Sequence, residues 1–455
     1  MRWDFTHLAR RTPTVWHLVV SLLLWEFTLL STPAHATPTD LFGFGARSPA
    51  LAMGGVASSE NAEAAHLNPA RLALLRRKSI LIGASGGRYR VGIDGETTPI
   101  EAVRSTMIGF VLPLGFGDVL EKRLVIGGAF YTPLGALLRG DVRFAEVPHW
   151  AVINRAHSLG LSVAMGIDMS GLVDGLAIGG GVSALATLVG DLRVQLDETN
   201  TFQSVVETQL LASFSPIVGV SFEEPIWMRE HPSAPSRFGF GVVYRHELRS
   251  DMDLKVVVSD LPVRVPVLNL AGTIQYDPPQ VAIEGFARPW PWVRLSAQLH
   301  ARFWSAYPGP ARATSSNSLA PPRVGFSDTL SPRIAMEVMS DVKALHIVFR
   351  TGYAFEASPA PPARLASPIG PDGQPLMGDD GPVPLRIIDN DRHLFGFGIG
   401  LIAHLSERER ITFDLFGQLH WLPDRTHAIG RSQNAPPMVS YGSIWVGGWT
   451  SGIEF

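Results

Sequence analysis

One serine stands in a spacing that hydrolases use for a nucleophile. Gly83, Ser85 and Gly87 match the pattern Gly-x-Ser-x-Gly, which needs a sharp turn from a strand into a helix. Residues 88–93 alternate as a strand does and show no helical period. The motif alone would suit acyl transfer, but its context favours a glycine-rich first strand, and we expect no catalytic residue.

The other polar clusters lack the geometry of a catalytic or metal site. Gly179-Gly180-Gly181 has no strand–turn–helix setting for a phosphate, and the charged run 245–249 suits solvent or lipid headgroups at a strand end. The chain has no cysteine, which excludes thiol catalysis and zinc–thiolate sites. The histidines near strand ends form no recognisable ligand set: His393, His404, His420 and His427. We expect no metal and no cofactor.

The elements that carry these residues alternate like membrane strands. In residues 441–455, alternate positions include Tyr441, Trp445, Trp449 and Phe455, whereas the intervening positions are mostly small or polar. One face of this strand is therefore aromatic. A C-terminal Phe455 on such a strand resembles the signal by which the assembly machinery of the bacterial outer membrane recognises barrels. A soluble sheet that ends in Phe is the alternative.

Composition favours the same class. Charged residues make up 17% of the chain, glycine is frequent at 45 residues, and no apolar run after residue 36 is long enough for a spanning helix. A membrane protein without such helices must be a closed barrel, because lipid cannot pair with free backbone groups. The net charge of −3 gives no electrostatic case for nucleic acid.

We predict an all-β fold, a transmembrane antiparallel β-barrel of about 14 strands with a small helical hatch inside it. Fifteen segments are candidate strands, and because single-chain bacterial barrels have an even count, at least one assignment is wrong. They begin near Ser79, Ala102, Lys122, Asn154, Gly175, Gln209, Arg237, Met252, Gln280, Trp292, Arg333, Leu345, Arg392, Glu409 and Tyr441. The proline-rich segments 305–332 and 357–384 are expected to be loops.

Three parts follow one another along the chain. Three arginines and an apolar run over 15–30, before a small-x-small site at Ala34-His35-Ala36, predict a signal peptide over 1–36. Glu26 inside the apolar run leaves a retained anchor as the alternative. Residues 37–77 do not alternate and predict the hatch, and 78–455 predict the barrel.

The block from Phe44 to Leu72 resembles the N-terminal hatch of the FadL family, outer-membrane transporters of long-chain fatty acids and other hydrophobic compounds. The resemblance rests on a glycine-rich start, on Met53-Gly54-Gly55 and on Asn68-Pro69-Ala70 before the first strand. Later segments are similar to parts of the family's barrel: 130–135, 278–305 and 350–361. The acidic residues before Asn68 and the proline-rich late loop depart from the family.

The resemblance implies passive transport of a hydrophobic solute. The solute would bind outer loops, enter a pocket between hatch and wall, and leave sideways into the bilayer after the hatch N-terminus shifts. Apolar residues that would line the pocket, or would alternatively form only hatch core, are Leu41, Phe42, Phe44, Leu51 and Met53. Residues expected to position the hatch are Asn68, Pro69 and Ala70.

The expected partners are a hydrophobic small molecule or fatty acid, membrane lipid and lipopolysaccharide, and the barrel assembly machinery. The protein is expected to be a monomer in the bacterial outer membrane. Related barrels with a similar opening serve in protein secretion, so an accessory secretion barrel is the alternative function. A lipid-acting enzyme that uses Ser85 is a further alternative.

Overall fold

The computed structural model describes residues 39–115, 123–134, 138–139, 146–150, 152–153, 157–196, 202–231, 234–259, 268–310, 321–342, 345–369, 382–406, 409–431 and 435–455. The expected signal peptide, residues 1–36, lies outside these ranges. Within them, no helix is both long enough and apolar enough to cross a membrane.

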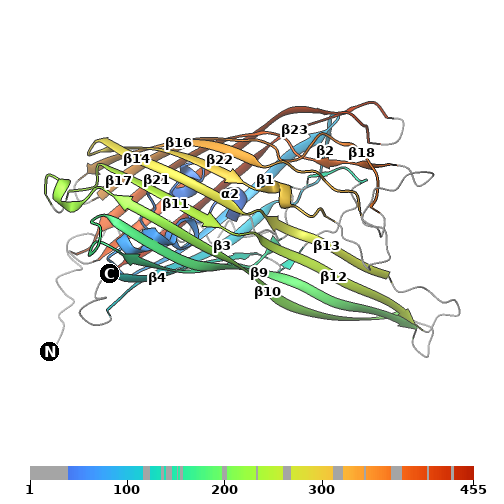
Figure 1. Ribbon diagram of the computed structural model, residues 1–455, viewed down its shortest axis with the longest axis horizontal. Helices are drawn as coiled ribbons and strands as arrows, with labels where there is room; N and C mark the ends of the chain where they lie inside the picture. Colours follow the sequence, from blue (N-terminus) through green and yellow to red (C-terminus); the bar gives the residue numbers. More distant parts are fainter. Residues whose placement is uncertain are drawn as a thin grey trace, which may run out of the picture. The chain divides into compact units, whose positions relative to one another are not determined.

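Fourteen antiparallel strands of the described chain form a closed ring (Figure 1). Each strand pairs with the next, and β23 pairs with β1 from Ser79↔Glu454 to Ile93↔Ser440, which closes the barrel. The wall strands are β1 (Ser79–Ile93), β3 (Val103–Leu114), β4 (Leu124–Pro133), β8 (Gly160–Asp168), β9 (Leu176–Leu196), β10 (Phe202–Glu223), β11 (Phe238–Arg245), β14 (Gln280–Trp290), β15 (Val293–Arg302), β16 (Thr329–Val342), β17 (Leu345–Glu356), β21 (Arg392–His404), β22 (Arg410–His427) and β23 (Met438–Glu454). The predicted fold class and strand number are confirmed.

The alternation of each strand separates an apolar outer face from a polar inner face. On β15, Leu295 and Leu299 are each 44% exposed on the outside, whereas Gln298 and His300 are buried in the lumen. Successive side chains of a strand must face opposite ways, so this sequence pattern fixes which face meets the interior. The lumen is therefore lined with side chains that can bind ions or form hydrogen bonds.

One of the fifteen predicted strands, the one expected near Met252, exists but does not belong to the wall. It is β12 (Leu248–Ser259), which forms a hairpin with β13 (Leu268–Asp277). This hairpin is inserted between β11 and β14, which pair directly with each other at Arg245↔Gln280. β12 instead runs parallel to the C-terminal part of β9, from Met252↔Leu188 to Ser259↔Gln195 (Figure 1). The strand β13 was not predicted.

Short elements connect the wall strands. β2 (Glu96–Thr97) folds back and pairs antiparallel with the end of β1, and η4 (Ile226–Met228) and η5 (Trp304–Ala306) are single 3-10 turns. Three two-stranded pairs are β5 (Leu138–Arg139) with β7 (His157–Ser158), β6 (His149–Trp150) with β20 (Ile387–Ile388), and β18 (Arg364–Ala366) with β19 (Val383–Leu385).

Two predicted loops contain more strand than expected. The first was predicted to extend to Pro332, but β16 begins at Thr329 and pairs Pro332 with Leu299. The second contains the short β18–β19 pair. The strand expected near Asn154 begins at Gly160 as β8.

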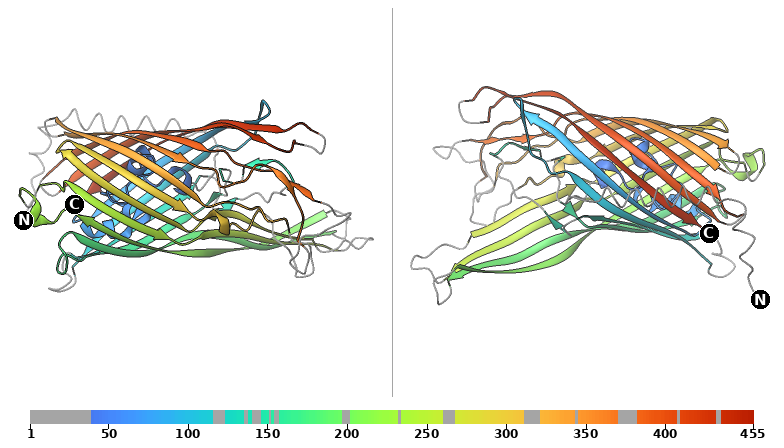
Figure 2. Two further views of the ribbon diagram at one scale, coloured as in Figure 1. Left: turned by 45° about the horizontal axis from the view of Figure 1, so that its top comes forward. Right: turned by 180° about the vertical axis from the view of Figure 1, so that it is seen from behind.

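Residues 39–75 form the hatch, which lies inside the ring of strands (Figure 2). It contains three single-turn α-helices and one 3-10 helix: α2 (Thr39–Phe42), α3 (Arg47–Ala50), α4 (Ala64–Leu67) and η3 (Pro69–Leu74). Helices this short are not stable alone, so packing against the wall holds them.

Candidate binding site between the hatch and the barrel wall

Glycines of the wall allow the hatch backbone to lie directly against the strands. A β-carbon on Gly179 of β9 would collide with the backbone of Pro69 and Ala70, and one on Gly396 of β21 with the carbonyl of Ala50. Only glycine permits so close an approach. The wall glycines that meet the hatch backbone in this way are Gly166, Gly179, Gly241, Gly352 and Gly396, and those that meet hatch side chains are Gly109, Gly127, Gly219 and Gly398.

A buried ion cluster joins the hatch to three neighbouring strands. Arg47 of the hatch donates to both carboxylate oxygens of Glu337 on β16, at 3.0 and 2.6 Å. Arg294 of β15 and Arg350 of β17 bind the same carboxylate at 2.7 and 3.1 Å. We call these four residues the Glu337 cluster. Since a buried charge that loses its partner costs about 3–5 kcal/mol, the cluster resists separation of α3 from the wall.

A second buried ion cluster lies beside the first. Glu356 of β17 binds Arg302 at 3.0 Å, Arg333 at 2.9 Å and Arg392 at 2.6 Å. Arg302 also lies 3.9 Å from the carboxylate of Asp40 in the hatch. Three guanidinium groups around one glutamate leave this part of the lumen rich in positive charge.

Two more carboxylates bind the hatch backbone. Glu63 accepts hydrogen bonds from the backbone N–H groups of residues 46–48 at 3.0–3.1 Å. Glu284 of β14 accepts from the turn 55–58, through the N–H groups of Gly55 and Ala57 and the hydroxyl of Ser58. Charge-assisted hydrogen bonds therefore hold the hatch backbone both at residues 46–48 and at the turn 55–58.

Asn68, Pro69 and Ala70 lie where the hatch turns toward its last helix. The amide of Asn68 donates to the carbonyls of Val56 and Val220, at 2.8 and 3.2 Å, and its side-chain oxygen caps η3 through the N–H of Ala70. Pro69 is the first residue of that helix, where its missing N–H costs nothing. Their positioning role stays a prediction, and these contacts support it.

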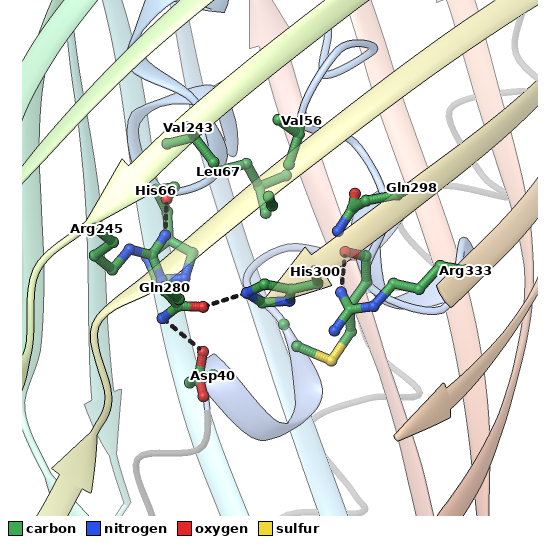
Figure 3. A pocket seen from close by; sticks show the side chains of 13 residues that line it. Asp40, Val56, His66, Leu67, Val243, Arg245, Gln280, Gln298, His300 and Arg333 are labelled. Atoms are coloured by element: carbon green, nitrogen blue, oxygen red, sulfur yellow. Dashed lines mark hydrogen bonds between the residues drawn. The ribbon is translucent and has the colours of Figure 1, made fainter. Parts of the chain in front are cut away.

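A small cavity of about 40 Å³, lined by both apolar and polar side chains, lies between the hatch and strands β11, β14, β15 and β16 (Figure 3). Gln280 connects its two sides, because its Nε2 donates to Asp40 at 3.2 Å and its Oε1 meets the Nε2 of His300 at 2.5 Å. Arg333 donates to the carbonyl of Met53 at 2.8 Å, and Arg245 donates to that of His66. The cavity thus joins hatch and wall through polar contacts.

Several residues around this cavity can accept a further polar partner. The Nε atoms of Arg245 and Arg333, the Oε1 of Gln298 and the Nδ1 of His300 are buried and have no hydrogen-bond partner among the described residues. Buried polar atoms are normally paired, so the Nε–H donors of the two arginines suit water or an anionic group, whereas the acceptor atoms of Gln298 and His300 suit water. Burial and the nearby Arg245 lower the pKa of His66 to about 3, which keeps this imidazole neutral.

The cavity is too small for a long acyl chain in this arrangement. A buried water needs about 10–15 Å³, so 40 Å³ holds about three groups of that size. A second cavity of about 20 Å³ shares Asp40, His66 and Arg245 with the first and adds Phe44 and Tyr131. Passage of a long chain therefore requires the hatch or the mouth of the barrel to move.

Two short segments of the loops pack against the hatch beside Leu41 and Phe42. Ile388 of β20 pairs with Trp150 of β6, and both are fully buried. They belong to one apolar core with Leu41 and Phe42 of the hatch. We call the described residues 149–150, 152–153 and 386–390 the mouth lid.

The five predicted ligand residues are all buried but do not line one pocket. Met53 lines the larger cavity and Phe44 the smaller one. Leu41 and Phe42 pack under the mouth lid, and Leu51 lies against the wall at Gly352. Their contact with a ligand stays a prediction.

The ionic lining of the lumen was missed by the sequence analysis. Its signal was present in β15, where Arg294, Gln298, His300 and Arg302 all lie an even number of residues apart. Polar and charged residues that recur with period two face one side of a strand. Their pairing with β16 and β17 could not be read from one strand.

Ser85 lies within β1, opposite Ser105 of β3, and the two hydroxyl groups are 2.8 Å apart. The strand continues to Ile93 without the turn into a helix that a nucleophilic serine of this motif requires. The motif is therefore part of a glycine-rich strand.

No family model matches the chain, and no curated protein matches it. Among solved structures, the chain is similar to a Pseudomonas aeruginosa FadL homologue, with 12% identity and a TM-score of 0.55 over 92% of this chain and 98% of that one. It is also similar, at lower TM-scores of 0.49 and 0.47, to the P. putida toluene transporter TodX and to the CymD monoaromatic hydrocarbon channel. TodX has 12% identity, and the match covers 91% of this chain and 99% of TodX. CymD has 11% identity, and the match covers 90% and 98%. The chain therefore has the fold of the FadL homologue, a hatch-plugged barrel, as the resemblance in its sequence implied.

Proposed function

We propose that the protein is a passive channel of the bacterial outer membrane for hydrophobic small molecules, with long-chain fatty acids as the first candidate substrate. The observation that carries this proposal is a closed fourteen-strand barrel, in the fold of a FadL homologue, whose lumen is filled by a hatch. An apolar outer face with a polar interior suits an outer membrane. Movement of solute would follow its concentration gradient.

The polarity of the route favours an acid over a neutral hydrocarbon. A solute that passes the mouth lid meets apolar Leu41 and Phe42, and then the cavity with Arg245 and Arg333. Guanidinium groups bind carboxylates through paired hydrogen bonds. An amphiphile with an acidic head and an apolar chain would satisfy both environments in turn.

The N-terminal part of the hatch is the segment most able to move. Arg47 anchors the hatch in the Glu337 cluster, whereas residues 39–45 lie before this anchor. Gly43 and Gly45 have positive φ angles of 89° and 82°, a backbone conformation that glycine permits readily. We propose that these glycines are hinges for a shift of residues 39–45.

A sideways exit into the bilayer is part of the proposal and needs a change in the wall. The described pairings between wall neighbours are continuous except for register shifts at Ala287/Trp290 and Leu422/Arg425. A solute would leave sideways only if two neighbouring wall strands part. Uptake by a variant whose hatch is tethered to the wall tests whether movement of the hatch must come first.

Uptake of labelled oleate and labelled toluene tests the function. Cells that lack their own fatty-acid porin would be compared with and without the protein, with heat-modifiable gel mobility as the control for insertion. We expect oleate uptake above background. Arg245→Gln is expected to reduce oleate uptake several-fold and toluene uptake little, whereas Arg249→Gln, at a partly exposed position of the β12–β13 hairpin outside the cavity lining, is the matched control.

The remaining outcomes separate the alternatives. Phe44→Ala tests the predicted hatch pocket in the same assay. An inserted barrel that takes up neither compound would contradict fatty-acid transport and favour the accessory secretion function, for which the next measurement is the protein or lipid that purifies with it.

A further inference from the structure

Two arginines lie on the outer, lipid-facing side of strand β1. Along this strand Leu81 and Val91 are buried toward the lumen, whereas Ile80 and Ile82 are each 49% exposed on the outside. Arg88 and Arg90 have the same parity as Ile80 and are also exposed. Their guanidinium groups therefore belong to the face that meets lipid, not to the ion clusters of the lumen.

The position of these arginines along the strand places them at the rim of the apolar band. The outer face of β1 and β3 below them is apolar, with Ile80, Ile108 and Phe110 exposed. Arg88 lies eight residues beyond Ile80, which is about 27 Å along a strand and about 20 Å along the barrel axis at a tilt near 40°. The apolar band of such barrels is about 25 Å tall, so Arg88 and Arg90 lie where lipid chains end and headgroups begin.

Neither arginine has a counter-ion on this surface. The side chains of Arg88 and Arg90 make no hydrogen bond or ion pair with any described residue. The nearby Glu96 is already bound by Arg431. The guanidinium groups of Arg88 and Arg90 therefore give this patch an excess of positive charge at the membrane rim.

Exposed tryptophans stand beside the two arginines. Trp445 lies opposite Arg88 in the β1–β23 pair, and Ser443 lies opposite Arg90. Trp445 is 52% exposed and donates its Nε1 to Ser443 at 3.2 Å. Trp421, 51% exposed, pairs with Ser443 from the other side. Amphipathic indole rings at this height suit the boundary between lipid chains and headgroups.

We propose that Arg88 and Arg90, flanked by Trp445, form a binding site for a phosphate group of an outer-leaflet lipid. A guanidinium group binds phosphate through two parallel hydrogen bonds, and two such groups about 7 Å apart on one face can hold one phosphate between them. The tryptophans contact the adjoining sugar or acyl region. The site rests on the proposed membrane placement and is independent of transport.

Native mass spectrometry of the full-length barrel in detergent tests the site. The probe is bisphosphorylated lipid A, compared with the same lipid after removal of both phosphates. We expect the phosphorylated lipid to bind at least tenfold more tightly than the dephosphorylated one, and the Arg88→Gln/Arg90→Gln double variant to lose this preference. Arg323→Gln removes one exposed arginine of a loop and serves as the matched control, which should keep the preference.

Three results would overturn the site. They are equal binding of the two lipids by the unmodified barrel, an unchanged preference in the double variant, and full competition by millimolar inorganic phosphate, which would indicate a general anion site. Arg88→Lys/Arg90→Lys keeps the charge and is expected to weaken binding partially. If the double glutamine variant does not fold, the lipid comparison and the lysine variant still decide.

Discussion

Asn68 of the hatch occupies the space that a side chain on Gly219 of β10 would need. The amide of Asn68 donates to the carbonyl of Val220, the next residue of that strand, at 3.2 Å. The hatch is thus fitted to the wall through a missing side chain on one partner and a polar side chain on the other.

Gly219→Ala is expected to displace Asn68 and loosen the hatch, because overpacking of this kind costs about 1–3 kcal/mol. The measurement is limited proteolysis of the hatch in the detergent-solubilised barrel. Gly180→Ala is the matched control, since a β-carbon there would lie 3.8 Å from its nearest neighbour. Equal protease resistance of the two variants would show that the close contact does not hold the hatch.

Asn68 itself offers a sharper comparison. Asn68→Ala loses the helix cap and the hydrogen bonds to Val56 and Val220, and should destabilise the docked hatch by about 1–3 kcal/mol. Asn68→Asp keeps the cap but cannot donate to the two carbonyls, so it is expected to be at least as destabilising. Urea-dependent exposure of the hatch measures both, and a mild aspartate variant would argue that only the cap matters.

Glu337→Gln is expected to raise the conductance of the barrel in a planar bilayer. The substitution leaves Arg47, Arg294 and Arg350 around a neutral amide, and breaking a buried pair in this way costs about 3–5 kcal/mol. Glu409→Gln, in an exposed turn, is the control and should leave conductance unchanged. A Glu337→Gln barrel with the conductance of the unmodified protein would mean that the cluster does not restrain the hatch.

The mouth lid should be tighter in acid than at neutral pH. Burial raises the pKa of Asp389 to about 6, against the opposing effect of Arg392 and Arg425. Since this pKa is above the unfolded value near 3.9, the lid is most stable below pH 4, loses stability as the pH rises to 6, and changes little above it. The loss corresponds to about 3 kcal/mol for two pKa units.

Hydrogen exchange of residues 382–391 measures this effect. After correction for the intrinsic rate, exchange should be faster at pH 7.5 than at pH 5 in the unmodified protein and nearly equal in Asp389→Asn. Faster exchange of the unmodified lid at pH 5 would contradict the sign of the prediction.

The ring of strands could be predicted because alternation is a property of each strand alone. Thus β1, β17 and β22 were found within two residues of their starts from period-two apolar patterns. The segment from Met252 was one of fifteen candidates for about fourteen wall strands, because β12 alternates as wall strands do and nothing local reveals that it pairs with β9. Pro332 was assigned to a loop, although the pairing of β16 tolerates it.

The site was less predictable because it depends on which strands become neighbours. From the sequence, Gly179 was considered only for a phosphate site and Gly396 only for tight packing or room in the lumen, and only the docked hatch shows that both contact it. Arg47 and Glu337 are 290 residues apart in the chain. The mouth lid was missed because Trp150 and Ile388 lie in short segments without a period.

The β12–β13 hairpin leaves the wall at Arg245 and returns at Gln280, and these two residues face each other in adjacent strands. A two-residue turn could join them without disturbing the ring, since such turns connect paired strand ends. The hairpin is thus comparable to a domain inserted at a loop, although its Tyr276 packs in one core with Val152 and Ile387 of the mouth lid. Exchange of residues 246–279 for another sequence would display a new surface on this scaffold and repack the lid, while the ring of strands stays closed.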